Sequence, residues 1–259
     1  MPLKGKTALV TGGGKGIGRQ ICIKLASWGA HLVIADICGE GILETARLAK
    51  ENSGLDSVLS VTDLRDESAV KRLAALAQEN SDIHFLINNS GVTGPTANVE
   101  DISLEEWNDC MSVNMTGIFL LCKYLVPHMK TLGDARIVNL SSIAPKLPLP
   151  WRAPYCASKM AIIGFTRCLA KELGPSGIRV NAICPGTVEG ERQNGVIDNI
   201  ARQTGKPREE VVAMKAERIP LQRFVTESDV AGMVAFLCSP EAAMVTGQDL
   251  NVTGGAIMW

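Results

Sequence analysis

Short apolar, β-branched runs alternate with longer helical patterns along the whole chain, and this alternation restricts the fold more than any other feature. Parallel strands need a crossover of about a dozen residues or more, which a helix with two loops supplies. The pattern therefore predicts an α/β fold with a mostly seven-stranded parallel sheet, doubly wound as a single Rossmann-type domain over residues 1–259. The expected strands cover residues 7–10, 32–35, 57–61, 83–87, 136–140, 178–183 and 250–252, and the expected helices cover residues 17–28, 40–52, 66–79, 104–131, 155–173 and 227–238.

The composition argues against several classes of function. The chain has 26 basic and 27 acidic side chains and a formal net charge of -1, so without a basic block we expect no nucleic-acid partner. The first residues lack the apolar core of a signal peptide, and no window approaches ~18 consecutive apolar residues, so we expect a cytoplasmic protein without a membrane partner. The eight cysteines form no C-x-x-C pair and the three histidines lie far apart, so we expect no metal site.

One long segment interrupts the alternation. Residues 187–226 contain no expected strand and carry seven basic and six acidic side chains. Two interpretations are open, a solvated pair of helices or a helical lid over a substrate. We favour the lid because the segment directly follows a strand end, on the side of an α/β sheet where ligands bind.

A glycine-rich turn follows the first expected strand and opens the first helix. It has the sequence T-G-G-G-K-G-I-G over residues 11–18. Glycines in such a turn let the backbone approach a pyrophosphate, whose charge is met by free N–H groups and by the positive end of the helix. The turn therefore predicts a dinucleotide site formed by Gly12, Gly14, Lys15, Gly16, Ile17 and Gly18.

Asp36, at the end of the second expected strand, bears on the choice of dinucleotide. A carboxylate there can accept hydrogen bonds from both hydroxyls of the adenosine ribose, and it would repel a 2′-phosphate. The alternative is a turn or N-cap role before the next helix. Lys15 favours the opposite choice, because it could reach a 2′-phosphate. We expect NAD as the cofactor, with NADP less favoured.

Tyr155 and Lys159 form the strongest catalytic signal. They lie four residues apart at the start of an expected helix, so both side chains occupy one face. A free phenol is a poor base at neutral pH, but a neighbouring ammonium stabilises the phenolate. Ser142 adds a hydroxyl at the end of the strand over 136–140. The alternatives are a buried aromatic residue and a surface lysine, and the presence of Ser142 favours a catalytic set.

Together these motifs resemble the classical short-chain dehydrogenase/reductase family, over residues 11–255. The spacing T-G-x-x-x-G-x-G is the family's and differs from the common G-x-G-x-x-G. The family usually has alanine in place of Ser90. It often has threonine in place of Gly190 to bind the nicotinamide carboxamide, and here Thr187 is the alternative for that contact. The matching pieces are Asp63-Leu64, Asn88-Asn89-Ser90-Gly91, Asn114, Ser142, Tyr155 with Lys159, and Pro185-Gly186.

The resemblance implies how the cofactor is held. Asp63, followed by Leu64, would face the adenine amino group. The segment 88–91, with Asn89, Ser90 and Gly91, would support the sheet and lie along the cofactor. The remaining cofactor contacts implied by the resemblance are Tyr155, Lys159, Pro185, Gly186 and Val188.

The resemblance also implies a reaction. Tyr155 would remove the hydroxyl proton of an alcohol, hydride would pass to the nicotinamide, and Ser142 would hold the substrate oxygen. The family spacing to Tyr155 selects Ser142 over Ser141. The proton would leave through Lys159 and a water bound at a helix distortion around Asn114, for which a plain core amide is the alternative. The presence of Ser142, Tyr155 and Lys159 argues against a non-catalytic NAD-binding sensor.

Three basic residues bear on the substrate. Lys146, Arg152 and Arg192 fall in segments that should border it, and arginine can bind a carboxylate, sulfonate or phosphate in bidentate fashion. They predict a small, polar or anionic secondary alcohol or ketone, bound by Arg152 and Arg192 with Ser142 and Tyr155. Alternatively the three cations point to solvent or pair with glutamates, and the apolar stretch 147–151 admits a neutral or acyl-type ketone.

The expected assembly also follows from the resemblance. The helices over 104–131 and 155–173 look apolar on more than one face, which indicates burial beyond one sheet contact. Members of the family pair through these helices. We therefore expect a homo-oligomer, a tetramer or a dimer.

Overall fold

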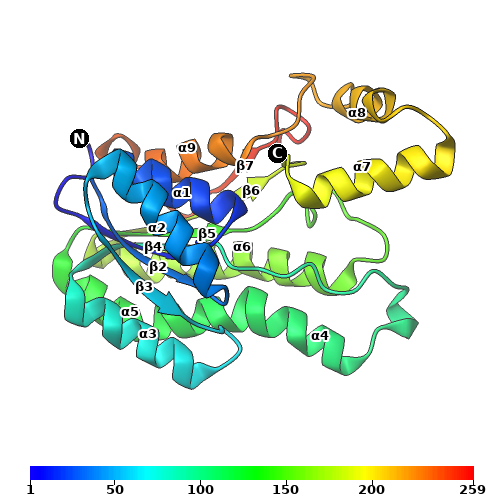
Figure 1. Ribbon diagram of the computed structural model, residues 1–259. Helices are drawn as coiled ribbons and strands as arrows, with labels where there is room; N and C mark the ends of the chain where they lie inside the picture. Colours follow the sequence, from blue (N-terminus) through cyan, green and yellow to red (C-terminus); the bar gives the residue numbers. More distant parts are fainter.

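All seven strands lie in one parallel sheet, as the alternation predicts. In this computed structural model the order across the sheet is β3-β2-β1-β4-β5-β6-β7, and every neighbouring pair is parallel (Figure 1). The predicted seven-stranded, doubly wound sheet is confirmed. The strands are β1 (Thr7–Thr11), β2 (His31–Asp36), β3 (Ser57–Val61), β4 (Ile83–Asn88), β5 (Ala135–Leu140), β6 (Ile178–Pro185) and β7 (Asp249–Val252).

Helices cover both faces of this sheet. On one face α1 packs between α2 and α9, and on the other α3 packs on α5 while α6 lies along β6. Every residue of β1 and β5 is buried, because a parallel strand between two helical layers has no solvated face. The helices are α1 (Gly16–Ser27), α2 (Gly39–Ser53), α3 (Glu67–Asn80), α4 (Leu104–Met111), α5 (Gly117–Leu132), α6 (Ala153–Leu173), α7 (Glu191–Thr204), α8 (Arg208–Ala216) and α9 (Glu227–Cys238).

The helix expected over 104–131 is not continuous. A π-helical turn, η2 (Ser112–Thr116), joins α4 to α5, and such turns inside α-helices frequently lie at functional sites. By length and composition the stretch Leu104–Leu132 could cross a membrane, but half of its most apolar window is buried inside the protein. Its apolar residues contact α3, β4 and β5, which is the environment of a core helix.

The segment 187–226 forms a helical pair that projects from the sheet. Figure 1 shows α7 and α8 beyond the carboxyl ends of the strands. The pair has a small core of its own, made of Ile197, Val211, Ile219 and Phe224. At its base Val188 forms a β-bridge with Val225. The helical pair of the first interpretation is therefore present, and its action as a lid remains a prediction.

The structure describes the backbone of residues 1–259 and all side chains except those of residues 191, 192, 199 and 203. The predicted substrate contact of Arg192 therefore lies outside the described side chains.

Candidate active site

Predicted site residues follow the ends of several strands, at the carboxyl edge of the sheet. Because β1 pairs with β2 on one side and with β4 on the other, the strand order reverses between β1 and β4. Ligands of open α/β sheets bind at such a reversal, outside the carboxyl ends of the strands. The glycine-rich turn follows β1, Asn89 follows β4, Ser142 follows β5, and Pro185 ends β6.

The glycine-rich turn packs too closely for side chains. A Cβ on Gly12, whose φ is +64°, would lie 2.8 Å from Asn89 Nδ2, and a Cβ on Gly18 would lie 1.9 Å from the Gly12 oxygen. Asn89 Nδ2 holds the turn by donating to the carbonyl oxygens of Thr11 and Gly12, each at 3.0 Å. The backbone of this turn is therefore held in place, and its glycines cannot be replaced by residues with side chains without a shift.

The N-terminus of α1 is left uncapped by side chains. Its N-cap residue, Lys15, makes no side-chain capping hydrogen bond, whereas Asp66 caps α3 and Ser103 caps α4. The first N–H groups of an α-helix have no partner within the helix, and with the helix dipole they suit a phosphate. The turn and this helix end together fit the pyrophosphate of a dinucleotide.

Asp36 is directed at the same turn. Its Oδ2 accepts a hydrogen bond from the Gly14 N–H at 2.9 Å, and its Oδ1 accepts one from the Cys38 N–H at 3.0 Å. The turn role that we considered as an alternative is thus present. Each carboxylate oxygen can accept a further bond, so the geometry leaves the predicted ribose contact available.

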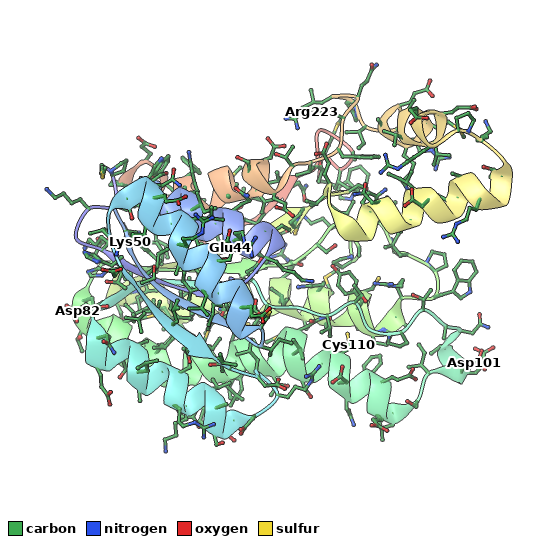
Figure 2. All side chains as sticks on the ribbon, viewed as in Figure 1. Glu44, Lys50, Asp82, Asp101, Cys110 and Arg223 are labelled. Carbon is green, nitrogen blue, oxygen red and sulfur yellow. The ribbon has the colours of Figure 1, made fainter. Side chains whose placement is uncertain are left out.

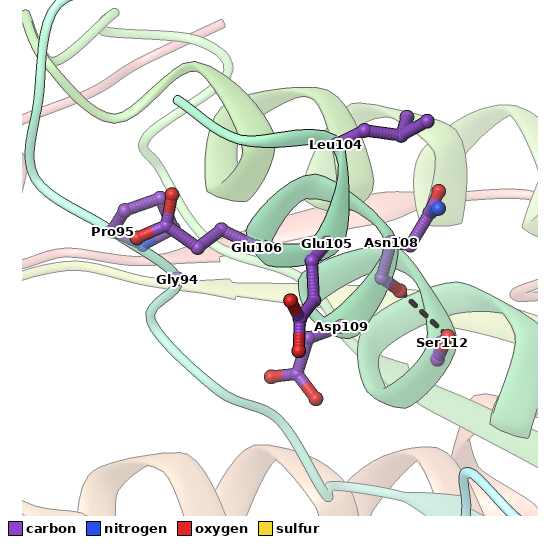
Figure 3. Close-up of a pocket in the computed structure, with 8 residues that line it drawn as sticks. All are labelled: Gly94, Pro95, Leu104, Glu105, Glu106, Asn108, Asp109 and Ser112. Carbon is purple, nitrogen blue, oxygen red and sulfur yellow. Dashed lines mark hydrogen bonds between the residues drawn. The ribbon is translucent and has the colours of Figure 1, made fainter. Parts of the chain in front are cut away.

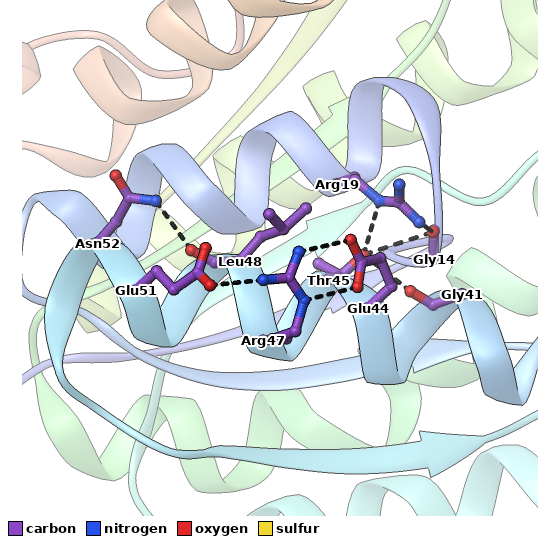
Figure 4. A network of polar contacts seen from close by, with 9 residues as sticks. All are labelled: Gly14, Arg19, Gly41, Glu44, Thr45, Arg47, Leu48, Glu51 and Asn52. Atoms are coloured by element: carbon purple, nitrogen blue, oxygen red, sulfur yellow. Dashed lines mark hydrogen bonds and ion pairs between the residues drawn. The ribbon is translucent and has the colours of Figure 1, made fainter.

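Arg19 is a residue of the nucleotide end that sequence reasoning missed. Its Nη2 donates to the Gly14 oxygen at 2.5 Å and its Nε to Thr45 Oγ1 at 3.1 Å, which ties the turn to α1 and α2 (Figure 4). On the outer side of α2, Arg47 pairs with Glu44 and Glu51 in the same view. A single arginine in a helix gives no sequence signal of this kind, because its partners are set by packing.

Asp63 and Leu64 follow β3. The Asp63 carboxylate accepts a hydrogen bond from the Arg65 N–H at 2.9 Å and pairs with the Arg65 guanidinium at 3.1 Å. Leu64 is buried against Gly117, where a Cβ would lie 2.8 Å from the Leu64 Cβ. The adenine contact of Asp63 stays a prediction.

Lys159 is buried beside Tyr155. Only 4% of Lys159 is exposed, and its Nζ lies 5.9 Å from the centre of the Tyr155 ring. The ammonium donates to the Leu140 oxygen at 2.7 Å and faces Gly91, where a Cβ would lie 3.3 Å from Nζ. Because the end of β5 holds the ammonium in place, its charge stays close to the phenol.

Asn114 lies in the π-helical turn and meets Lys159 across Gly91. A Cβ on Gly91 would lie 3.2 Å from Asn114 Oδ1. The amide is fully buried: Oδ1 accepts from the Val92 N–H at 2.7 Å, and Nδ2 donates to Ser158 Oγ at 2.9 Å. The helix distortion implied by the resemblance is present, while the hydrogen bonds are those of a core amide. Its part in proton release remains a prediction.

The two neighbouring serines have different environments. Ser141 is buried, and its Oγ donates to the Lys159 oxygen at 2.7 Å. Ser142 is half-buried, and its Oγ accepts from the Ala144 N–H at 3.1 Å. Among the described residues the Ser142 hydroxyl donates no hydrogen bond. Ser142 is therefore the serine with a proton to offer to a substrate oxygen.

The segment after β6 returns to the nucleotide end. Gly186 packs on Thr253, and Val188 is held by its bridge to Val225. A further residue that sequence reasoning missed is Glu227, whose Oε1 lies 3.5 Å from where a Cβ would stand on either Gly16 or Gly190. Burial raises the pKa of Glu227 above its ordinary value.

A hollow of about 770 Å³ lies beside this site, between α4 and the loop after β4 (Figure 3). Two of its three carboxylates already have partners, since Glu106 completes a capping box with Ser103, and Asp109 pairs with Arg65 at 2.7 Å. Neither Ser142, Tyr155 nor Lys159 lines it. The hollow is lined by Gly94, Pro95, Leu104, Glu105, Glu106, Asn108, Asp109 and Ser112.

The fold and the site define a nicotinamide-dinucleotide oxidoreductase, and the comparisons agree. A family model described as enoyl-(acyl carrier protein) reductase matches residues 12–256. An uncharacterized oxidoreductase of Thermotoga maritima is 37% identical over 99% of both chains. The structure of NAD+-bound xylitol dehydrogenase has a TM-score of 0.90 at 30% identity, covering 98% of this chain and 100% of that one. A variant of actinorhodin polyketide ketoreductase with NADPH has a TM-score of 0.88 at 35% identity over 97% of both chains.

The chain belongs to the classical short-chain dehydrogenase/reductase family, as the motifs predict. It is therefore an oxidoreductase that acts on alcohol or keto groups with a nicotinamide cofactor. The relatives divide over the cofactor, since the xylitol dehydrogenase was crystallised with NAD+ and the ketoreductase with NADPH.

Proposed function

We propose that this protein interconverts a secondary alcohol and a ketone with NAD(H), in a single domain that carries both the cofactor and the substrate site. The observation that carries the proposal is the buried Lys159 ammonium, which lies beside the Tyr155 ring and donates to the Leu140 oxygen, two residues before Ser142. Among the described residues the Ser142 hydroxyl donates no hydrogen bond. When bound, the nicotinamide supplies the hydride acceptor or donor.

The side chains of this protein bind the substrate and transfer the proton. Ser142 donates to the substrate oxygen and orients it. Tyr155 takes the hydroxyl proton in oxidation and returns it in reduction, as a general base and acid. The buried Lys159 ammonium stabilises the phenolate, and the proton leaves along Lys159 toward Asn114. In this proposal the helical pair over 187–226 closes over the substrate.

The substrate class follows in part from the same residues. A small, polar ketone suits a site with Ser142 and Tyr155, and the cation Arg152 favours an anionic one. Two alternatives remain, a neutral or acyl-type ketone, which the ketoreductase relative supports, and a non-catalytic NAD-binding sensor. Incubation with panels of secondary alcohols and ketones, with NAD(H) or NADP(H), separates them by the absorbance of the reduced cofactor. Turnover of any alcohol or ketone in these panels would contradict the hypothesis of a non-catalytic NAD-binding sensor.

For the cofactor, we expect the protein to use NAD at least about tenfold better than NADP in kcat/KM, because the Asp36 carboxylate repels a 2′-phosphate. Asp36→Asn removes the charge and keeps one of the two acceptor oxygens, so either the Gly14 or the Cys38 N–H loses its hydrogen bond. The substitution should narrow the preference for NAD, as measured by kcat/KM with both cofactors. Equal use of NAD and NADP by the unmodified protein would instead make Lys15 the deciding residue.

The affinity for NADH is expected to fall as the pH rises through the elevated pKa of Glu227. Deprotonation places a carboxylate next to the pyrophosphate turn, and two charges about 4 Å apart in water interact with about 1 kcal/mol, or about fivefold in affinity. Titrations by NADH fluorescence over pH should show this fall, and Glu227→Gln should remove it. Glu241→Gln, just beyond the opposite end of α9, is the control. A fall that persists in Glu227→Gln would contradict the assignment.

We further propose that the chain works in the cytoplasm as a homo-oligomer, a tetramer or a dimer. Large apolar side chains remain exposed on the helices expected to pair: Phe119 on α5 is 46% exposed and Met160 on α6 is 48% exposed. Burial of such side chains against a second copy would remove them from water. Light scattering of the purified protein measures the mass that tests this.

A further inference from the structure

Two of the three cations predicted to border the substrate have described side chains, Lys146 and Arg152. Lys146 already pairs with a carboxylate. Its Nζ lies 2.7 Å from an Asp249 carboxylate oxygen and donates to Asn251 Oδ1 at 2.7 Å, so it is directed at β7. Lys146 therefore pairs with a carboxylate, as in the second interpretation of the three cations. Its partner is Asp249 and not a glutamate. Its charge is not available to a substrate.

Arg152 differs from Lys146, because no ion pair to a carboxylate is found for it among the described side chains. It is the N-cap residue of α6, and its guanidinium carbon lies 5.4 Å from the centre of the Tyr155 ring. Nη1 donates to Thr96 Oγ1 at 2.9 Å, and Nε is buried without a hydrogen-bond partner. Among the described residues no carboxylate pairs with this guanidinium. A buried N–H without a partner is costly, and none of the described residues supplies one for Nε.

The backbone next to Arg152 is strained in a way that fixes its position. Trp151 has a φ of +63°, in the left-handed region that a bulky residue rarely adopts. Two hydrogen bonds hold it there: the Ala97 N–H donates to the Trp151 oxygen, and Trp151 Nε1 donates to Asn98 Oδ1, both at 3.1 Å. These bonds join the loop before α6 to the loop that carries Thr96. Such strain persists where the surrounding structure over-determines it, often at ligand sites.

We propose that Arg152 binds an anionic group of the substrate, a carboxylate or a sulfonate, so that the enzyme acts on hydroxy acids or hydroxy sulfonates and the corresponding ketones. This rests on the proposed function, because the anion must belong to the molecule that Tyr155 and Ser142 hold. With Nη1 tied to Thr96 and Nε buried, Nη2 is the guanidinium nitrogen that can donate to an oxygen of the anion. The position of Arg152 beside the Tyr155 ring limits the substrate to one with the anion a few bonds from the reacting carbon.

The test compares matched substrates in the unmodified protein, Arg152→Gln and Arg152→Lys. The substrates are 2- and 3-hydroxy acids, the corresponding hydroxy sulfonates, and the neutral amides of the acids. We expect KM for the preferred anion to rise about tenfold to a hundredfold in Arg152→Gln, as for loss of a charge-assisted pair, and KM for the amides to stay within about threefold. Arg152→Lys should recover part of the loss, because it keeps the charge without the planar fork.

Binding without turnover supplies a second readout. Quenching of NADH fluorescence reports the complex of the protein with NADH and an unreacted hydroxy acid or hydroxy sulfonate. Arg152→Gln should weaken this complex while leaving the affinity for NADH alone unchanged. Lys146→Gln is the matched control, because it removes a cation of the same loop that already pairs with Asp249. It should leave the preference for the anionic substrate over its neutral amide unchanged.

The outcomes separate this proposal from the proposed function. Turnover of neutral substrates with no preference for anions, or a preference unchanged in Arg152→Gln and Arg152→Lys, overturns the role of Arg152 and leaves the oxidoreductase standing. Absence of turnover with every alcohol and ketone overturns both. A preference for the acids over the sulfonates, or the reverse, identifies which anion the site takes.

Discussion

Turnover is expected to fall by a factor of about a hundred to ten thousand when Tyr155 is replaced by phenylalanine, the range typical of a lost general acid or base. The ring remains, so packing beside Lys159 and Arg152 is kept, and NADH affinity should stay within about threefold. Steady-state kinetics with a substrate from the panel, together with NADH fluorescence titration, measure the two quantities separately.

The chain provides a matched control for this experiment in its only other tyrosine. Tyr124 lies on the surface of α5, where its hydroxyl donates to Glu67 Oε1 at 2.6 Å. Tyr124→Phe removes the same atom far from the carboxyl edge of the sheet and should leave turnover unchanged. Turnover of Tyr155→Phe within tenfold of the unmodified protein would contradict the role of Tyr155 as the base.

Lys159→Ala is expected to impair both chemistry and cofactor binding. The buried ammonium stabilises the phenolate, and it lies against Gly91 in the segment predicted to follow the cofactor. We expect kcat to fall by about a hundredfold or more, and the dissociation constant of NADH to rise about tenfold, the effect of losing one charge-assisted hydrogen bond. The same kinetic and fluorescence measurements apply.

Two further variants make this result specific. Lys159→Met keeps most of the buried volume, so a loss shared by Lys159→Ala and Lys159→Met comes from the charge and not from a cavity. Lys123→Ala removes a surface lysine that pairs with Glu67 at 3.0 Å, and it should change neither quantity. If NADH affinity were intact in both Lys159 variants, the role of Lys159 would be limited to the proton.

The architecture could be predicted from local pattern alone. All seven strands and five of the six predicted helices occur within a few residues of the expected positions, and the sixth, over 104–131, is divided by η2. A strand buried on both faces needs a continuous apolar run, and its covering helix needs an apolar stripe. The spacing of the glycine-rich turn and of Tyr155 and Lys159 is likewise local, since one turn and one helical face contain each motif. These features required no knowledge of distant contacts.

Local pattern left the form of the segment 187–226 open between two interpretations, and the helix distortion at Asn114 was implied by the family resemblance alone. The core of the helical pair α7 and α8 has only four residues, and two of them, Ile219 and Phe224, lie beyond both helices. The turn at Asn114 is favoured by bonds to Val92 and Ser158, which come from two other segments of the chain. A helical sequence does not show where such bonds will interrupt it.

Sequence by itself determined the class of this protein, through motifs whose residues lie within a few positions of one another. Only the tertiary structure decided which neighbours the isolated charges have. Lys146 pairs with Asp249, and Arg152 lies beside the Tyr155 ring. Glu227 lies next to Gly16, more than two hundred residues away in the sequence. The physical reason is that a charge on a side chain is satisfied by whatever packing brings within a few ångströms. Those partners come from strand order and loop contacts, which spacing along the chain does not encode.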